Sequence, residues 1–378
     1  MNRRSDRLKS LPEYPFARIT RLKKGVKRDI IDLGIGDPDL PTPEYIISSL
    51  KNAIDDPITH QYPPYNGYLS LRKEIALWYK KRFNVSLSPH NEILPLLGSK
   101  DGISHILFSI INPSDYVLVP DPGYPVYKSA TILAGGIPKI VPLLSQNGFL
   151  PDLDNIDPKG CKAFFLNYPN NPTAAVCSLD FLKNLVSFAR KNNIIILFDL
   201  AYSEVYFDEK PPSLLQIEGG IDVGIEFHSF SKTYNMAGWR LGFCVGNRDI
   251  IQSLLSLKTN LDSGIFGAVQ HAGISALKDE GFVEEMRKVY KRRLDILASG
   301  LSSCGFKVDM PKATFYLFLP IKGSSFDFSE RLLKDTGVVV TPGISFGEYG
   351  EGFVRFSLTS PDDKIEEAVA RIKKGFRI

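Results

Sequence analysis

A lysine between two serines and an arginine marks the stretch "FHSFSKTYNMAGWRLGF", residues 227–243. Lys232 follows Ser229 and Ser231 and precedes Arg240. A lysine in water has a pKa of about 10.4, but burial beside other cations lowers that pKa and lets the amine attack an aldehyde. Hydroxyl and guanidinium groups bind phosphate oxygens. The stretch is therefore either a polar surface turn or one wall of a pocket that holds a phosphate and reacts with an aldehyde.

Polar residues follow three other strand-like runs in the same way. Ser99 and Lys100 follow "EILPLLG", Asn171 lies in the turn after "KAFFLN", and Asp199 and Tyr202 follow "NNIIILF". Ligands of open α/β sheets bind beyond the carboxyl ends of the strands. We therefore expect these side chains to share one pocket with Lys232.

Each group has a chemical interpretation and a structural one. Backbone amides of Ser99 and Lys100 at a helix start form an anion site, although a simple helix cap explains "GSK" equally well. The Walker pattern for a nucleotide triphosphate is absent. A carboxylate at Asp199, ending an apolar strand, needs a cation such as a protonated pyridine nitrogen, unless it caps a helix or pairs with an arginine. Tyr124, in "PDPGYPVY", suits either a heteroaromatic ring or the core.

Short apolar runs alternate with helical patterns through the first two thirds of the chain. This alternation predicts an α/β fold whose mainly parallel sheet is covered on both faces. After about residue 258 an amphipathic helix, from about Phe282 to Leu301, precedes the strand-like runs "ATFYLFLP", "GVVVTP" and "FVRFSLT", which predicts a smaller α+β domain. We expect three parts: an N-terminal segment, 1–45, that packs with the small domain, a large domain, 46–257, and the small domain, 258–378.

Composition argues against several classes of protein. The formal net charge is only +4 and the basic residues are scattered, so we expect no nucleic-acid partner. The four cysteines and five histidines lack the spacing of metal ligands, so we expect no metal site. There is neither a signal-like N-terminus nor an apolar run of about 18 residues, which favours a cytoplasmic protein without a membrane partner.

The motifs together resemble the fold-type I pyridoxal-phosphate enzymes, specifically the class I/II aminotransferases. The resemblance runs in order through eight stretches that cover nearly the whole chain: "LGIGDPDLPTP", "QYPPYNGYLSLR", "GSKDGI", "DPGYPVY", "NYPNNPT", "FDLAYSEVYF", "SFSKTYNMAGWRLGF" and "FVRFSLT". One such stretch is a weak signal, whereas eight in register are specific.

The resemblance implies a role for each candidate residue. Lys232 matches the lysine that forms an internal aldimine with pyridoxal 5'-phosphate and moves the substrate's α-proton, and Asp199 matches the partner of the pyridinium nitrogen. The other implied cofactor contacts are Asn171 and Tyr202 at the phenolic oxygen, Tyr124 on the ring, and Ser99, Lys100, Ser229, Ser231 and Arg240 at the phosphate. Arg355 matches the arginine that binds the substrate α-carboxylate, and Gly36 matches a glycine whose backbone lies beside it.

Tyr62, in "QYPPYNG", matches a tyrosine that reaches the phosphate of the neighbouring subunit, which implies a homodimer with shared active sites. The sequence departs from the family pattern at Ala174, where glycine is usual, and at Leu200, where asparagine is common. Neither position carries chemistry in this interpretation.

The implied reaction is a ping-pong transfer of an amino group from an amino acid to a 2-oxo acid, 2-oxoglutarate. Within the family the motifs are most similar to the LL-diaminopimelate aminotransferase group, which favours LL-2,6-diaminopimelate as donor and places Tyr14, Lys100 and Asn171 near the substrate. Aspartate, alanine and aromatic aminotransferases share these motifs. A pyridoxal-phosphate lyase also stays open, as does a regulator on the same scaffold, although the intact Lys232 and Arg355 argue against a regulator.

Overall fold

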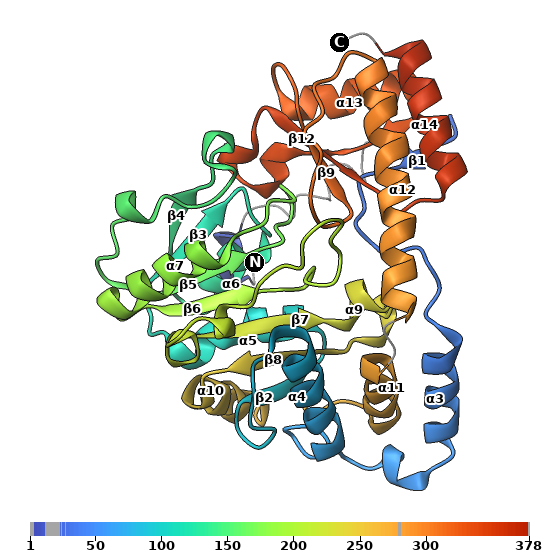
Figure 1. Cartoon of the computed structure of the whole chain (residues 1–378). Coiled ribbons are helices and arrows are strands. Elements are labelled where there is room, and N and C mark those ends of the chain that lie inside the picture. The colour runs from blue at the N-terminus through green and yellow to red at the C-terminus, as the bar shows by residue number, and fades with distance from the viewer. Residues whose placement is uncertain (1–3, 12–22, 24, 27, 279–280, 377–378) are drawn as a thin grey trace.

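The computed structural model describes residues 4–11, 23, 25–26, 28–278 and 281–376. Figure 1 shows a large body around one twisted sheet and, above it in orange and red, a smaller domain. The long helix α12 (Gly281–Ser303) runs from the small domain down beside the large one.

A seven-stranded sheet forms the centre of the large domain, in the order β2-β8-β7-β6-β5-β3-β4. Strands β4, β3, β5, β6 and β7 are parallel, and β8 is antiparallel to both of its neighbours. This arrangement confirms the expected mainly parallel sheet. The strands are β2 (Ile93–Leu96), β3 (Tyr116–Asp121), β4 (Ile137–Pro142), β5 (Cys161–Asn167), β6 (Ile195–Asp199), β7 (Gly224–Ser229) and β8 (Gly242–Gly246).

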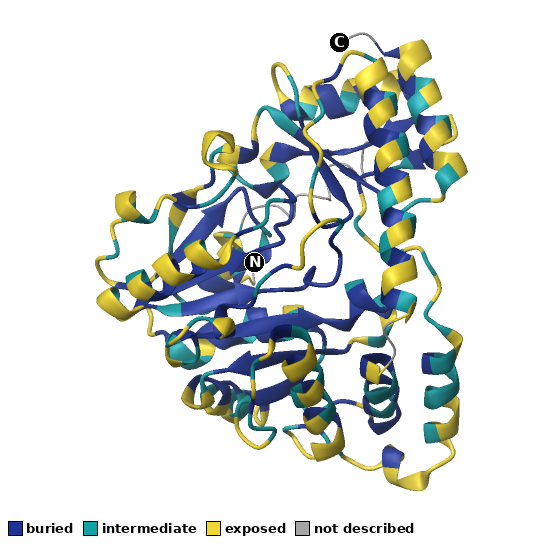
Figure 2. Ribbon diagram, in the orientation of Figure 1, coloured by how far each residue is buried: buried dark blue, intermediate teal, exposed yellow. Residues whose placement is uncertain are grey.

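Helices cover both faces of this sheet, and its central strands are buried (Figure 2). At the start of α7 (Leu179–Asn192) the hydroxyl of Ser178 accepts a 3.1 Å hydrogen bond from the Phe181 amide and so caps the helix. None of the helices in the described ranges is both long and apolar enough to cross a membrane. The helices of the large domain are α3 (Glu44–Ile54), α4 (Leu69–Phe83), α5 (Ser99–Ile110), α6 (Val126–Leu133), α7 (Leu179–Asn192), α8 (Gly220–Val223), α9 (Phe230–Thr233), α10 (Arg248–Lys258) and α11 (Gly267–Lys278).

The small domain is built on a three-stranded antiparallel sheet of β11 (Thr341–Pro342), β12 (Phe353–Ser357) and β9 (Tyr316–Pro320). Helices α12, α13 (Ser325–Thr336) and α14 (Asp362–Gly375) pack around it. The run "GVVVTP", which reads as one strand in the sequence, is divided between two sheets. Its first half, β10 (Val338–Val339), pairs in parallel with β1 (Ile31–Asp32) from the N-terminal segment.

The packing of α11 changes the expected division of the chain. This helix lies against α3 and α4, and a side chain at Gly273 would press on Leu241 and Leu71. Residues 267–278 therefore pack with helices of the large domain, although they follow the boundary expected at residue 257. We propose that the small domain begins with α12.

Arg293 on α12 ties the N-terminal segment to the small domain. Its side chain is only 4% exposed, and it donates two hydrogen bonds, of 2.7 and 2.9 Å, to the carboxylate of Asp39. It also donates to Asp362 at the start of α14, at 3.0 Å, and to the Leu358 carbonyl, at 3.0 Å. Two carboxylates and one carbonyl thus converge on a single buried guanidinium.

We predict that Arg293→Met lowers the free energy of unfolding by about 2–4 kcal/mol, because it leaves Asp39 and Asp362 without their shared buried partner. Urea denaturation followed by circular dichroism measures the change. Arg292→Met is the matched control, since Arg292 pairs with the same Asp362 but is 56% exposed, and it should cost less than about 1 kcal/mol. Equal losses in the two variants would contradict the proposed tie.

Candidate active site

A cavity of about 400 Å³ lies where β5, β6 and β7 end, between the large sheet and the small domain. It brings together ten of the residues singled out in the sequence. They are Gly36, Ser99, Lys100, Tyr124, Asn171, Asp199, Tyr202, Ser229, Lys232 and Arg355. They come from separate strand ends and from both domains, so the fold brings together residues that lie far apart in the sequence.

Three other candidates do not line the cavity. Ser231 is buried and is not among the residues that line the cavity. The Arg240 guanidinium donates to the carbonyls of Ala237 and Leu97, at 2.9 and 3.3 Å, beside the start of α5. Tyr62 is 87% exposed and lies outside the cavity lining. Tyr14 lies outside the described residues.

Asp199, the last residue of β6, carries a buried carboxylate with neutral partners. It is 4% exposed and accepts hydrogen bonds from the Tyr127 hydroxyl, at 2.7 Å, and the Ala201 amide, at 3.0 Å. Burial raises the pKa of Asp199 to about 6, and these two hydrogen bonds limit the rise. No cation of the described residues forms an ion pair with it, so the site favours a ligand that brings a positive charge.

Lys232 lies on the short helix α9, directly after β7. Its Nζ donates a 3.0 Å hydrogen bond to the carbonyl oxygen of Gly36. Burial lowers the pKa of Lys232 to about 8; Asp37 opposes this change, while Arg355 and Arg240 add to it. An appreciable fraction of the amine is therefore neutral near neutral pH, as a nucleophile or base requires.

Arg355 on β12 is the positive counterpart of Asp199 in the cavity. The side chain is 2% exposed, donates to Asn171 Oδ1 at 2.6 Å and to the Gly34 carbonyl at 2.7 Å, and stacks 4.0 Å above the Tyr316 ring. Its buried Nε has no hydrogen-bond partner, and no described carboxylate pairs with the guanidinium. A planar cation with free donors suits a carboxylate.

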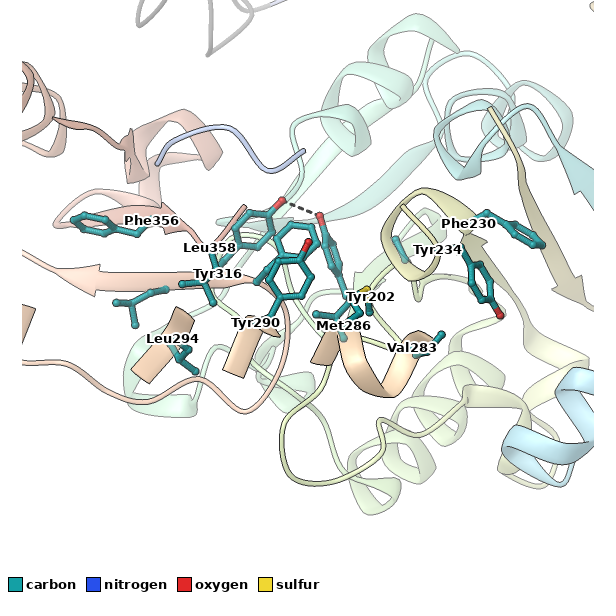
Figure 3. Close-up of a cluster of buried hydrophobic side chains, with 14 of the residues drawn as sticks. Tyr202, Phe230, Tyr234, Val283, Met286, Tyr290, Leu294, Tyr316, Phe356 and Leu358 are labelled. Carbon is teal, nitrogen blue, oxygen red and sulfur yellow. Dashed lines mark hydrogen bonds between the residues drawn. The ribbon is translucent and has the colours of Figure 1, made fainter. Parts of the chain in front are cut away.

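Tyr202 joins the two domains across the cavity. Its hydroxyl lies 3.0 Å from that of Tyr316, as the dashed line in Figure 3 shows, and the two rings come from the large and small domains respectively. The Tyr316 hydroxyl also lies so close to Gly36 that any side chain at position 36 would collide with it. This contact gives a steric reason for glycine at a position that the family resemblance alone had marked.

The start of α5 forms the anion-binding end of the cavity. Its N-cap is Gly98, with φ +86°, and no side chain of the described residues caps the helix, so the amides of Ser99 and Lys100 stay available to a ligand. Ser229, at the end of β7, faces the same cavity. A side chain at Gly242 would lie 2.6 Å from the Ser99 amide nitrogen, so β8 holds this turn closely.

Three residues of the site escaped the sequence analysis. Asn167, the last residue of β5, donates to the Asp199 carbonyl at 2.8 Å and meets the same strand-end criterion that selected Asp199. Tyr127, on α6, lies edge-on to Tyr124 in the loop before the helix, with 5.6 Å between the ring centroids, and this packing and its hydrogen bond to Asp199 link it to the site. Tyr316, on β9, has no local signal, because only the docking of the small domain brings it to the cavity.

These groups fit pyridoxal 5'-phosphate. The unpaired carboxylate of Asp199 suits a protonated ring nitrogen, the amine of Lys232 suits an aldehyde, and the free amides of α5 suit a phosphate. Arg355 is left to bind the carboxylate of a substrate.

Comparison with known proteins agrees with this chemistry. The family model "Aminotransferase class I and II" matches residues 28–372. Curated relatives include "LL-diaminopimelate aminotransferase" of Syntrophobacter fumaroxidans, 51% identical, and the protein of the same name from Aquifex aeolicus, 50% identical; each alignment covers 98% of both chains.

Solved structures show the same fold over nearly the full length. Substrate-bound BacF from Bacillus subtilis superimposes with a TM-score of 0.95 at 40% identity, covering 99% of this chain and 98% of that one. A probable N-succinyldiaminopimelate aminotransferase from Thermus thermophilus superimposes with a TM-score of 0.89 at 34% identity, covering 95% and 99%. The chain belongs to the class I and II aminotransferases and is a pyridoxal-phosphate-dependent transaminase.

Proposed function

We propose that this transaminase moves an amino group from LL-2,6-diaminopimelate to 2-oxoglutarate in a ping-pong reaction, with Lys232 covalently joined to the cofactor's aldehyde in the resting enzyme. One observation supports the site assignment above all. Asp199 and Arg355 are both buried at the cavity that Lys232 lines, and neither forms an ion pair with another described residue. The name shared by curated relatives about half identical over nearly the whole chain supports the substrate.

When bound, pyridoxal phosphate supplies an electron-withdrawing ring that stabilises negative charge on the substrate's α-carbon. Asp199 would hold the ring nitrogen in its protonated form, and Tyr127 keeps the carboxylate oriented. The first-turn amides of α5, at Ser99 and Lys100, would bind the phosphate.

Lys232 would carry the proton. Its Nζ, neutral in part because burial lowers its pKa to about 8, would accept the α-proton of the substrate and later return it. The hydrogen bond to the Gly36 carbonyl shows that the amine can reach the N-terminal segment that borders the cavity. Tyr202 and Asn171 would donate to the cofactor's phenolic oxygen and so stabilise its charge.

Arg355 would bind the α-carboxylate. Asn171 and the Gly34 carbonyl fix the guanidinium through separate nitrogen atoms and leave Nε free. Both acceptors lie outside the small domain, Asn171 in the large domain and Gly34 in the N-terminal segment. A substrate carboxylate on Arg355 would therefore also strengthen the contact between the small domain and the rest of the molecule.

The cavity border carries charges of both signs, which suits a substrate with a distal amino-acid group. Lys100, the ion pair of Lys23 with Asp32, and Asp37 all line it. A distal carboxylate and a distal ammonium could each find a partner there. An amino acid with an apolar side chain would offer no charged group to Lys100 or Asp37.

We also propose a homodimer in which Tyr62 reaches the phosphate of the partner. Tyr62 is too exposed to serve its own cavity, and Ile58, Tyr65 and Leu261 near it are exposed as well. The segments 57–65 and 261–266 lie side by side, since the rings of His60 and Phe266 are 5.9 Å apart.

The four free cysteines are in keeping with the cytoplasmic location expected from the sequence.

The pH dependence of cofactor attachment tests the role of Lys232. The folded pKa is lowered from 10.5 to about 8, and only the neutral amine attacks an aldehyde. Attachment of pyridoxal phosphate to the apoenzyme should therefore accelerate with rising pH and level off above about pH 8. Borohydride trapping followed by peptide mass spectrometry measures the rate and the site. Labelling of another lysine, label retained in Lys232→Ala, or a midpoint near that of a free lysine, would contradict the assignment.

A half-reaction tests the substrate. Adding LL-2,6-diaminopimelate to the holoenzyme should convert the bound cofactor to its amine form, seen by absorbance, and 2-oxoglutarate should restore the original spectrum. Arg355→Lys should need about 10- to 100-fold more substrate, because one amine replaces a planar pair of donors to a charged group.

L-Aspartate, L-alanine and L-phenylalanine serve as competing donors in the same assay. Conversion by one of these, with none by LL-2,6-diaminopimelate, would overturn the substrate while leaving the site intact. Release of ammonia and pyruvate without the amine form would indicate a lyase instead.

A further inference from the structure

A buried lysine outside the cavity connects α10 to the first turn of α5. The amides of Ser99 and Lys100 in that turn, called the cradle below, would bind the phosphate. Lys258, the last residue of α10, is 1% exposed. Its Nζ donates to Asp101 at 3.0 Å and to Asp262 at 2.6 Å. Burying an ammonium group is costly unless such partners compensate for the lost water. Both pairs raise the pKa of Lys258 although burial alone would lower it, so the group stays charged.

Asp101 carries this interaction to the anion-binding end of α5. It directly follows Lys100, and the oxygen that contacts Lys258 also accepts a 3.2 Å hydrogen bond from the Leu97 amide. Nδ1 of His105 lies 2.9 Å from its other oxygen. Burial would raise the pKa of Asp101, but His105 and Lys258 outweigh it and hold the pKa at about 2. The carboxylate is thus a fixed negative charge bound to the backbone just before the cradle.

No side chain of the described residues caps α5. The turn before the helix is closely enclosed, since a side chain at Gly98 would collide with the Arg240 guanidinium. A small shift of the Asp101 side chain would therefore move the amides of Ser99 and Lys100 relative to Arg240 and Gly242. Removing Lys258 would also leave Asp262 without its ionic partner and Asp101 with His105 alone, so negative charge would be less well balanced behind a site for an anion.

We propose that Lys258 is a positioning residue for phosphate recognition: through Asp101 it holds the first turn of α5 in place and balances the negative charge beneath it. This inference rests on the proposed function, because it assumes that α5 binds the cofactor's phosphate. It concerns the phosphate alone and predicts no change at the ring or aldehyde end of the cavity.

The test compares pyridoxal 5'-phosphate with pyridoxal, which lacks the phosphate, in titrations of the apoenzymes followed by absorbance. The wild-type chain should bind the phosphorylated form more tightly. In Lys258→Met this preference should fall at least about tenfold while the Kd for pyridoxal changes little, because one added negative charge and a displaced turn act only on an anion. Lys278→Met is the matched control, since its ammonium is exposed and 3.9 Å from Glu74, and it should keep the preference.

Equal weakening of both ligands would overturn the proposal by showing a general structural role, and an unchanged preference would overturn it outright. If Lys258→Met does not fold, Lys258→Gln removes the same positive charge with a polar side chain, and the same criteria apply to it. A wild-type chain without any preference for the phosphorylated form would contradict the proposed cofactor site itself, which distinguishes that failure from the failure of the role given to Lys258.

Discussion

A buried carboxylate without a protein cation is the constraint on which the rest of this structure depends. Asp199 ends a fully apolar strand, and the groups that bind its oxygens are a tyrosine hydroxyl and a backbone amide. Desolvation of an ionised group is costly, so such an arrangement is favourable only if a ligand completes it. In the proposed site a cationic ring nitrogen would do so, and the free amides of α5 together with Lys232 would then select the cofactor that carries it.

Arg355, the second buried charge without an ionic partner among the described residues, connects the domains. Arg355 belongs to the small domain, but its hydrogen bonds are to Asn171 of the large domain and Gly34 of the N-terminal segment. Pairing of β1 with β10 and the contacts of Arg293 with Asp39 hold that segment against the small domain. The proposed substrate site therefore lies where three parts of the chain meet, which is why its residues are so widely spaced in the sequence.

The strand-end criterion explains what could be predicted before the structure was known. Apolar runs show where strands end, and polar residues at those ends, such as Asp199 and Lys232, must meet at one edge of a parallel sheet. Such reasoning cannot find Tyr316 or the partners of Lys258, since those contacts depend on how helices and domains dock. It also missed the split of "GVVVTP" between two sheets, because a local pattern does not reveal which strand lies alongside.

The charge state of the cofactor's ring nitrogen tests the central claim most directly. Nitrogen-15 NMR of the holoenzyme, reconstituted with cofactor labelled at the ring nitrogen, distinguishes the protonated from the neutral form. We expect a protonated nitrogen at neutral pH in the wild-type chain and a neutral one in Asp199→Asn, which keeps the shape of the side chain and removes its charge. A neutral nitrogen in the wild-type chain, or a protonated one in the variant, would contradict the central claim.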